Sequence, residues 1–150
     1  MSSGKDQTRA RSAARLAAVQ ALYQLEMEAP ELHLLLDEFH MHRLGAEIED
    51  VEYAAADVAF FDDVVKGVAA RRDEIDALLA SKLAQGWSVA RLDRTMLQIL
   101  RAGARELMAR KDVAVGTVIN EYLDVAHAFF DAREAKFANG VLDAVAKSVR

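Results

Sequence analysis

The sequence contains no cysteine, which excludes disulfide bonds and thiolate metal sites. It has one proline and seven glycines in 150 residues, so residues that interrupt helices are rare. No apolar run approaches the roughly 20 residues of a membrane span, and the first ten residues, MSSGKDQTRA, lack the hydrophobic stretch of a signal peptide. These absences predict a soluble cytoplasmic protein with no membrane segment.

The motifs of common catalytic sites are missing as well. The chain has no GxSxG nucleophile elbow, no glycine-rich phosphate loop and no HExxH motif. His40 and His42, in the stretch HMH, have no third ligand at a suitable spacing, so we interpret them as ordinary surface or boundary residues. We therefore expect no enzyme activity, no cofactor and no metal site.

The residues that are present favour helix nearly throughout, because alanine, with 29 copies, has the highest helix propensity. The fold class we predict is all-α, a helical bundle of six to seven helices in two three-helix lobes, about 9–84 and 88–150. Residues 1–8 are expected to form a flexible tail, and residues 9–150 a single domain. The apolar spacing places helices at about 9–28, 31–44, 58–79, 93–108, 111–130 and 135–149.

Local signals mark where these helices begin and end. The step Ala29-Pro30 should end the first helix, because the residue before proline avoids the helical region. Residues 45–57 read as an acidic loop, and Asp57 and Asp93 can cap the helices that follow them. Gly86 is expected to break the pattern again.

The net charge of -5 hides an uneven distribution. Residues 1–15 hold four bases against one acid, whereas residues 16–65 hold twelve acids against Arg43 alone. Residues 66–150 hold fourteen bases and eleven acids. A basic end on an acidic chain permits the binding of a polyanion there.

Two groups of basic residues are candidates for such binding. Arg11 and Arg15 are four residues apart and share a helical face, with Arg9 in the preceding turn. A helical projection also places four arginines in one arc, which is either a solvated face pairing with acids or a phosphate-binding stripe. These four are Arg91, Arg94, Arg101 and Arg105.

Two phenylalanines flank the stretch FDAREAK, which also holds Arg133 and Lys136. Phe129 and Phe137 are either core closures between the last two helices or a platform for an unstacked base. Aromatic side chains beside basic groups are the usual means of binding single-stranded RNA.

Four stretches in a fixed order cover the chain from about residue 9 to its end. They are RSAARLAAVQALYQLEM at 11–27, LDRTMLQILRAGAREL at 92–107, DVAVGTVINEYLDVA at 112–126 and KFANGVLDAV at 136–145. Together they resemble the NusB family of bacterial transcription antitermination factors. The combination of AVQALY, INE and FxNGVLD is the specific part of this resemblance.

The resemblance implies a helical protein without catalytic activity that binds single-stranded boxA RNA of ribosomal RNA operon transcripts together with the ribosomal protein NusE. The pair would join the RNA polymerase elongation complex with other Nus factors. Tyr23 would face NusE. The chain departs from the family at Ser12 and Ala13, where members with a denser basic head have arginines, and at Arg133, where an acid is common. The RNA-binding residues implied are Arg9, Arg11, Arg15, Arg101, Phe129, Lys136 and Phe137.

Two other functions stay open at this point. The same helical module resembles the RNA-recruiting domain of a ribosomal RNA methyltransferase, but the chain contains no catalytic domain with a glycine-rich cofactor site. A homodimeric protein-interaction bundle is the second alternative, with the RNA face buried between two copies.

Overall fold

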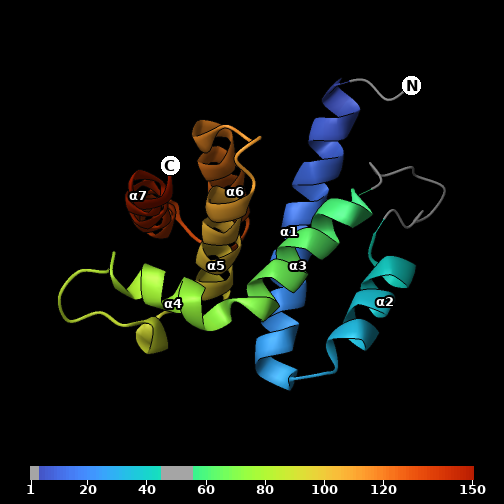
Figure 1. Cartoon of the computed structure of the whole chain (residues 1–150), viewed down its shortest axis with the longest axis horizontal. Helices are drawn as coiled ribbons and strands as arrows, with labels where there is room; N and C mark the ends of the chain where they lie inside the picture. Colours follow the sequence, from blue (N-terminus) through green and yellow to red (C-terminus); the bar gives the residue numbers. More distant parts are fainter. Residues whose placement is uncertain (1–3, 45–55) are drawn as a thin grey trace. The chain divides into compact units, whose positions relative to one another are not determined.

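The computed structural model describes residues 4–44 and 56–150, and these residues are helical with short connections (Figure 1). The predicted all-α class with six to seven helices is confirmed, since this part of the chain holds seven α-helices and one short 3₁₀ helix, η1. The chain divides into two compact units, residues 1–66 and 67–150. The elements are α1 (Gly4–Glu28), α2 (Leu32–His42), α3 (Val58–Ala70), α4 (Arg72–Ala80), η1 (Val89–Arg91), α5 (Arg94–Ala109), α6 (Val115–Phe129) and α7 (Ala132–Val149).

The division between the units lies inside α3 and not near residues 84–90, where the sequence pattern placed it. The reason is that α4 packs on α5 and α7, so residues 72–80 belong to the second unit. The single helix expected over 58–79 is two helices, because the backbone at Arg71 leaves the helical region, with φ -124° and ψ 27°.

Helix α1 begins at Gly4, which makes residues 4–8 its first turns instead of a flexible tail. The Thr8 hydroxyl donates to the Gly4 carbonyl at 2.8 Å, and the Ser12 hydroxyl donates to the Thr8 carbonyl at 3.0 Å. The helix ends at Glu28 as predicted. Ala29 follows with φ 48°, a left-handed conformation that costs an alanine roughly 1–2 kcal/mol.

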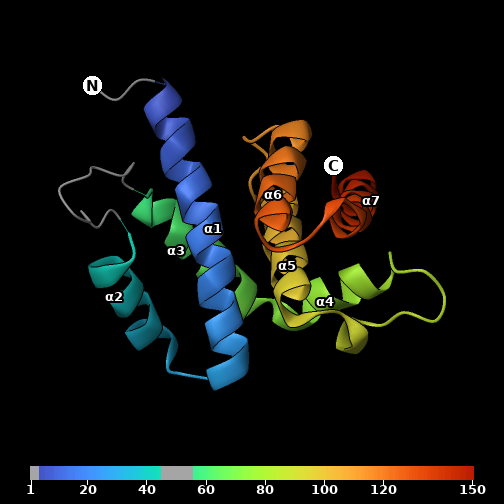
Figure 2. The ribbon, with the colours of Figure 1, turned by 180° about the vertical axis from the view of Figure 1, so that it is seen from behind.

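The first unit is built from α1, α2 and the beginning of α3. Figures 1 and 2 both show α2 returning alongside α1 after a short link. The rings of Phe39 and Phe61 stack with their centroids 5.5 Å apart, and both are buried. His40 Nε2 lies 2.6 Å from Asp62 Oδ1, which gives this histidine of the HMH stretch a structural partner.

Asp57 joins α3 to α1. Its side chain caps α3 as predicted, with Oδ1 accepting from the Phe60 backbone N–H at 2.9 Å. Its own backbone N–H donates to the Ala10 carbonyl at 3.0 Å. Most of the acidic loop expected over 45–57, namely residues 45–55, lies outside the described residues.

The second unit centres on α5, which is buried along most of its length and packs on α4, α6 and α7. Asp93 caps it, since its side chain accepts from the N–H groups of Thr95 and Met96. Tyr122 donates its hydroxyl to Glu106 Oε1 at 2.8 Å, and both residues are fully buried. Gly86, with φ 90°, lies in the connection between α4 and η1, since α4 already ends at Ala80.

Over residues 4–44 and 56–150, every helix is too short or too polar to traverse a bilayer.

Candidate nucleic-acid interface

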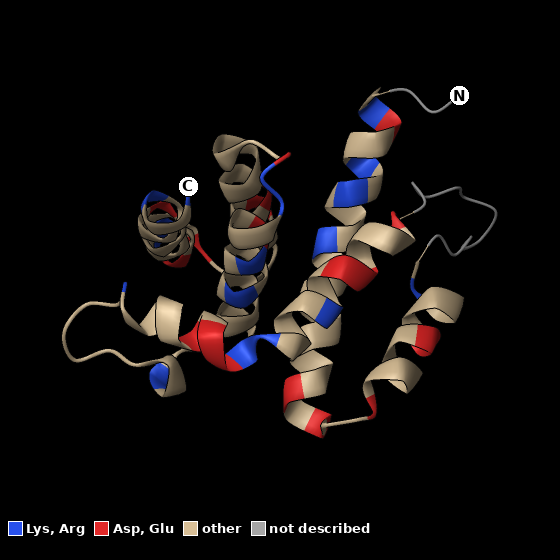
Figure 3. Cartoon of the chain, in the orientation of Figure 1, with Lys and Arg blue, Asp and Glu red and all other residues tan. Residues whose placement is uncertain are grey.

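Four basic residues, Lys5, Arg9, Arg11 and Arg15, form what we call the basic head of α1. In Figure 3 the blue bands gather on the N-terminal half of this helix and red bands mark its other end. Because α1 is continuous from Gly4, a step of about 100° per residue places Lys5 and Arg9 on a different face from Arg11 and Arg15, about 120° away around the helix. Lys5 and Arg9 are exposed.

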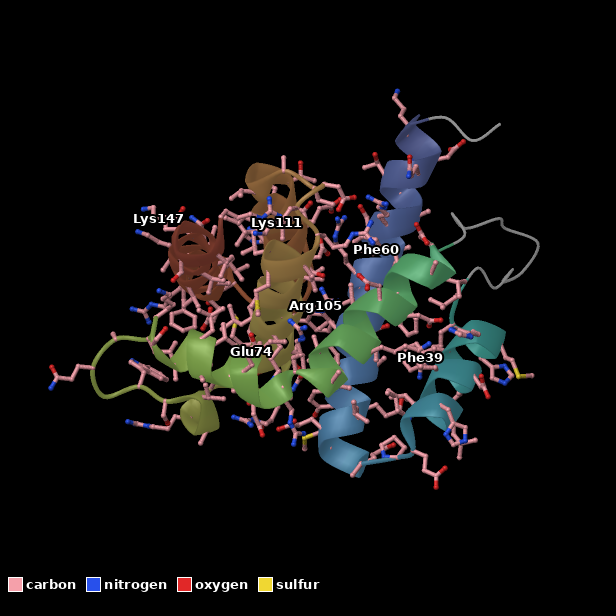
Figure 4. The ribbon with its side chains drawn as sticks, in the orientation of Figure 1. Phe39, Phe60, Glu74, Arg105, Lys111 and Lys147 are labelled. Carbon is pink, nitrogen blue, oxygen red and sulfur yellow. The ribbon has the colours of Figure 1, made fainter. Side chains whose placement is uncertain are left out.

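Arg11 and Arg15 share a face as predicted, and this face packs on Phe60 of α3 (Figure 4). Each guanidinium carbon lies 4.8 Å from the centroid of the Phe60 ring, a distance at which cation and ring attract. Arg11 Nε also lies 3.7 Å from Asp57 Oδ2. Arg15 is only 2% exposed, whereas about a quarter of the Arg11 side chain is accessible. Arg11 is therefore partly accessible to a ligand, whereas Arg15 is almost completely buried.

Arg101 is in the interior of the second unit and not on a basic surface. Its Nε and Nη2 atoms donate to the two carboxylate oxygens of Asp76 at 2.8 and 2.7 Å, a bidentate pair. Its Nη1 donates to Gln98 Oε1 at 3.3 Å, and the residue is 5% exposed. Contact with RNA would require Arg101 to leave Asp76.

The stripe of four arginines predicted over 91–105 does not form a continuous basic face. Arg91 belongs to η1, before α5 begins. Arg94 Nη2 donates to the carbonyls of Val89, Ala90 and Leu92, and Arg105 lies against Gly67 of α3, where a β-carbon would collide with its guanidinium. The helical projection was correct for α5 itself, but it could not show that packing uses these side chains internally.

The predicted aromatic platform is divided between two places. The connection between α6 and α7 is only Phe130 and Asp131, so Lys136 and Phe137 lie on α7 itself. Phe129 ends α6 and is 45% exposed, and Lys136 is exposed. Phe137 is half-buried, and the aromatic side chain beside it is Trp87, with ring centroids 6.4 Å apart.

Trp87 and Phe137 line a cavity of about 460 Å³, which we call the Trp87 pocket. Arg91 lies over the Trp87 ring, with its guanidinium carbon 5.6 Å from the centroid. Trp87 is nevertheless 53% exposed. The apolar lining is Trp87, Leu92, Met96, Phe130 and Phe137, and the charged lining is Arg91, Asp93, Arg133 and Glu134.

Two carboxyl groups at the start of α7 perturb each other beside this pocket. Asp131 caps α7 by accepting from the N–H of Arg133 at 2.9 Å. A hydrogen bond with the Asp131 side chain raises the pKa of Glu134, and the same interaction lowers the pKa of Asp131. Glu134 therefore takes up a proton more readily than an ordinary glutamate.

Tyr23, the residue predicted to face a protein partner, is 40% exposed on α1. Met27, four residues further on and exposed as well, lies on the same side of the helix. This end of α1 carries Glu26 and Glu28 and no basic residue in its last turn. The two ends of one helix thus differ in charge and in polarity.

Among residues 4–44 and 56–150, no three histidine, aspartate or glutamate side chains converge in a way that could hold an ion.

Sequence reasoning missed Lys5 and Trp87, and it placed Arg91 in the arginine stripe and not beside Trp87. Lys5 was assigned to a tail, although its spacing of four from Arg9 was a signal of a shared helical face. Trp87 is the only tryptophan and stands between Gly86 and Ser88, a context that places an aromatic ring in a connection. The spacing of Trp87 and Arg91 also allowed a contact, but only the fold brings Phe137 to them.

An all-helical chain with a basic helix end and an aromatic pocket has the features of a small helical binding protein. The comparison with protein families is specific: the NusB family matches residues 12–147. The chain belongs to the NusB family.

Relatives and solved structures agree with this assignment. The chain is 80% identical over 142 residues to the transcription antitermination protein NusB of Novosphingobium aromaticivorans, covering 95% of this chain and 96% of the relative. It is 47% identical to the protein of the same name from Caulobacter vibrioides, over 93% of this chain and 94% of the relative.

Two solved structures share the fold. NusB of T. maritima is 27% identical with a TM-score of 0.74, covering 91% of this chain and 90% of that one. A chain from the crystal structure of antitermination factors NusB and NusE in complex with dsRNA is 25% identical with a TM-score of 0.77, covering 93% of this chain and 98% of that one.

Proposed function

We propose that this chain is a transcription antitermination factor. It binds boxA RNA of ribosomal RNA operon transcripts together with NusE and joins the RNA polymerase elongation complex with other Nus factors. The names of its relatives and the neighbouring complex of NusB, NusE and RNA support this function. The role is that of a cytoplasmic adaptor without catalysis, and residues 9–150 act as one RNA-binding domain.

The observation that carries the proposal is the charge arrangement of α1. The helix dipole favours acids at the N-terminal end and bases at the C-terminal end, by about 0.3–1 kcal/mol for each charge. The last turn of α1 holds acids and no base, against this preference, while at the other end Lys5 stands beside Asp6 in the first turn and Arg9 follows. The exposed bases at this end are explained if the basic head binds an anion such as RNA phosphate.

The residues proposed to contact RNA differ in their accessibility. Lys5, Arg9 and Lys136 are exposed and can reach phosphates, and Arg11 can do so in part. Phe129 offers an exposed ring on which a base can stack. Arg15 and Arg101 remain residues of the proposed RNA site, but because they are buried, their role is to shape the site from the interior. Phe137 contributes the edge of its ring.

Tyr23 and Met27 form the proposed contact with NusE. An exposed tyrosine beside an exposed methionine is typical of the centre of a protein interface, where aromatic residues and methionine are enriched. Simultaneous binding of RNA to both proteins raises the effective concentration of each and strengthens a modest RNA contact.

The test is a titration of boxA RNA and a scrambled RNA against the chain, with and without NusE. We expect NusE to strengthen binding of boxA RNA more than of the scrambled RNA, and Tyr23→Ala to remove this gain while leaving the binding of RNA alone unchanged. A matched control is Leu34→Ala, another exposed apolar residue of the first unit. Equal binding of both RNAs, or no effect of NusE, contradicts the proposal, and a stable dimer unaffected by either ligand would favour a homodimeric bundle.

A further inference from the structure

The Trp87 pocket has features of a ligand site that the basic head of α1 lacks. Its volume of about 460 Å³ lies within the range of small-molecule sites, roughly 300–1,000 Å³. More than half of Trp87 is exposed although both Arg91 and Phe137 contact the ring. A flat aromatic surface is therefore available beside a half-buried second ring.

The charges around the pocket indicate what kind of group it accepts. Arg91 and Arg133 are balanced by Asp93 and Glu134, so the formal charge of the lining is zero. A phosphate gains little in such a setting, because each cation has a carboxylate nearby. A flat, neutral group with a polar edge fits better, and a nucleobase is such a group.

The carboxylates of the pocket lining indicate which polar edge of a nucleobase the pocket accepts. Asp93 Oδ1 already accepts from the backbone N–H groups of Thr95 and Met96, at 2.8 and 3.1 Å. Glu134 shares a hydrogen bond with the Asp131 side chain, but its Oε2 atom is buried and has no hydrogen-bond partner among the described residues, so this oxygen is the one left for a ligand. A carboxylate recognises the amino group of cytosine, which donates, and disfavours the carbonyl oxygen that uracil has at the same ring position.

We infer that the Trp87 pocket binds one unpaired nucleobase that carries an exocyclic amino group, stacked on the Trp87 indole and hydrogen-bonded to Glu134. This inference rests on the proposed function, because it assigns base recognition to a protein that we propose binds RNA. The base contact adds selectivity to the phosphate contacts of α1.

The experiment uses the fact that Trp87 is the only tryptophan, so its fluorescence reports on this pocket alone. The full chain is titrated with single-stranded oligo(C) and oligo(U) of equal length, and with duplex RNA. We expect oligo(C) to quench Trp87 and to bind about tenfold more tightly than oligo(U). The duplex should leave the fluorescence unchanged, since its bases are paired.

Two variants separate the contributions, with affinity measured by anisotropy of labelled RNA. Trp87→Ala should weaken oligo(C) binding roughly tenfold through lost stacking, and Trp87→Phe should restore part of it. Glu134→Ala should bring the affinities for oligo(C) and oligo(U) close to each other. Asp143→Ala removes the same charge from an exposed position on α7 and should leave their ratio unchanged.

The failures of the two proposals are distinguishable. If the chain binds no RNA with or without NusE, the proposed function itself is wrong. If RNA binds while Trp87 fluorescence and the Trp87→Ala affinity stay the same, only the pocket assignment is overturned. Quenching by NusE in the absence of RNA would make the pocket a protein interface, and equal quenching by duplex RNA would also refute the inference.

Discussion

Arg9, Arg11 and Arg15 carry the same charge within two turns of one helix, yet the structure predicts three different outcomes for their replacement by alanine. Arg9 is exposed, so Arg9→Ala should remove one phosphate contact and lower the slope of log K against log salt by about 0.7. The free energy of unfolding of the Arg9→Ala variant should change by less than about 0.5 kcal/mol, because substitutions of exposed residues usually have effects no larger than this.

Arg15→Ala should act on stability and not on the salt slope. Arg15 is 2% exposed and lies over the Phe60 ring, and a desolvated cation–π contact contributes about 2 kcal/mol. For a chain of this length, that loss lowers Tm by roughly 4 to 8 °C. Arg11, which is partly accessible over the same ring, should show a smaller loss of each kind, about 0.5–1 kcal/mol in stability.

The assays are urea denaturation and RNA affinity over a range of salt concentrations, both below the Tm of every variant. Arg72→Ala is the control, because Arg72 is an exposed arginine at the start of α4. If Arg15→Ala lowers the salt slope as much as Arg9→Ala and leaves stability unchanged, the burial of Arg15 does not describe its role. If Arg72→Ala matches Arg9→Ala, the effect reflects overall charge and not the basic head.

Two further predictions concern packing and the internal ion pair of the second unit. Gly140→Ala should stabilise α7 by about 1 kcal/mol, since no atom lies within 4 Å of the added carbon. Gly103→Ala should be less stable than Gly140→Ala by about 1–3 kcal/mol, because its added carbon would lie 2.8 Å from a leucine side chain. Urea denaturation measures the free energy of unfolding of both variants. Equal effects would contradict the close packing of α5 on α7. Asp76→Ala should lower the free energy of unfolding by about 3 kcal/mol by breaking the pair with Arg101. The RNA affinity of that variant, measured while it is folded, should fall if the pair holds Arg101 where it shapes the RNA site, whereas tighter binding would indicate that the released Arg101 contacts RNA.

The sequence predicted the elements whose signals are local. The end of α1 before Pro30 and the caps at Asp57 and Asp93 follow from backbone chemistry at single positions, and the structure confirms them. The start of α1 was placed too late, because composition suggested a tail and did not reveal that Thr8 and Ser12 bond within a continuous helix.

The sites depended on contacts between residues far apart in the chain. Helical spacing showed which arginines share a face, but it did not show whether that face meets solvent or another helix. Arg15 covers Phe60 and Arg101 pairs with Asp76, and neither partner is near in sequence. Trp87 gained its significance only when the fold placed it beside Phe137.

Some basic residues of 66–150 make contacts within their own unit, although others of them are exposed. Arg101 pairs with a carboxylate, and Arg94 and Arg150 bind backbone carbonyls, the latter at the C-terminal end of α5. In the proposed function, phosphate attraction comes from the exposed basic residues Lys5 and Arg9 of α1 and Lys136 of α7. In the further inference, the Trp87 pocket, with balanced charges and an exposed ring, takes up a nucleobase. If both proposals hold, the exposed basic residues set the salt dependence of RNA binding, and the Trp87 pocket sets which nucleobases are preferred.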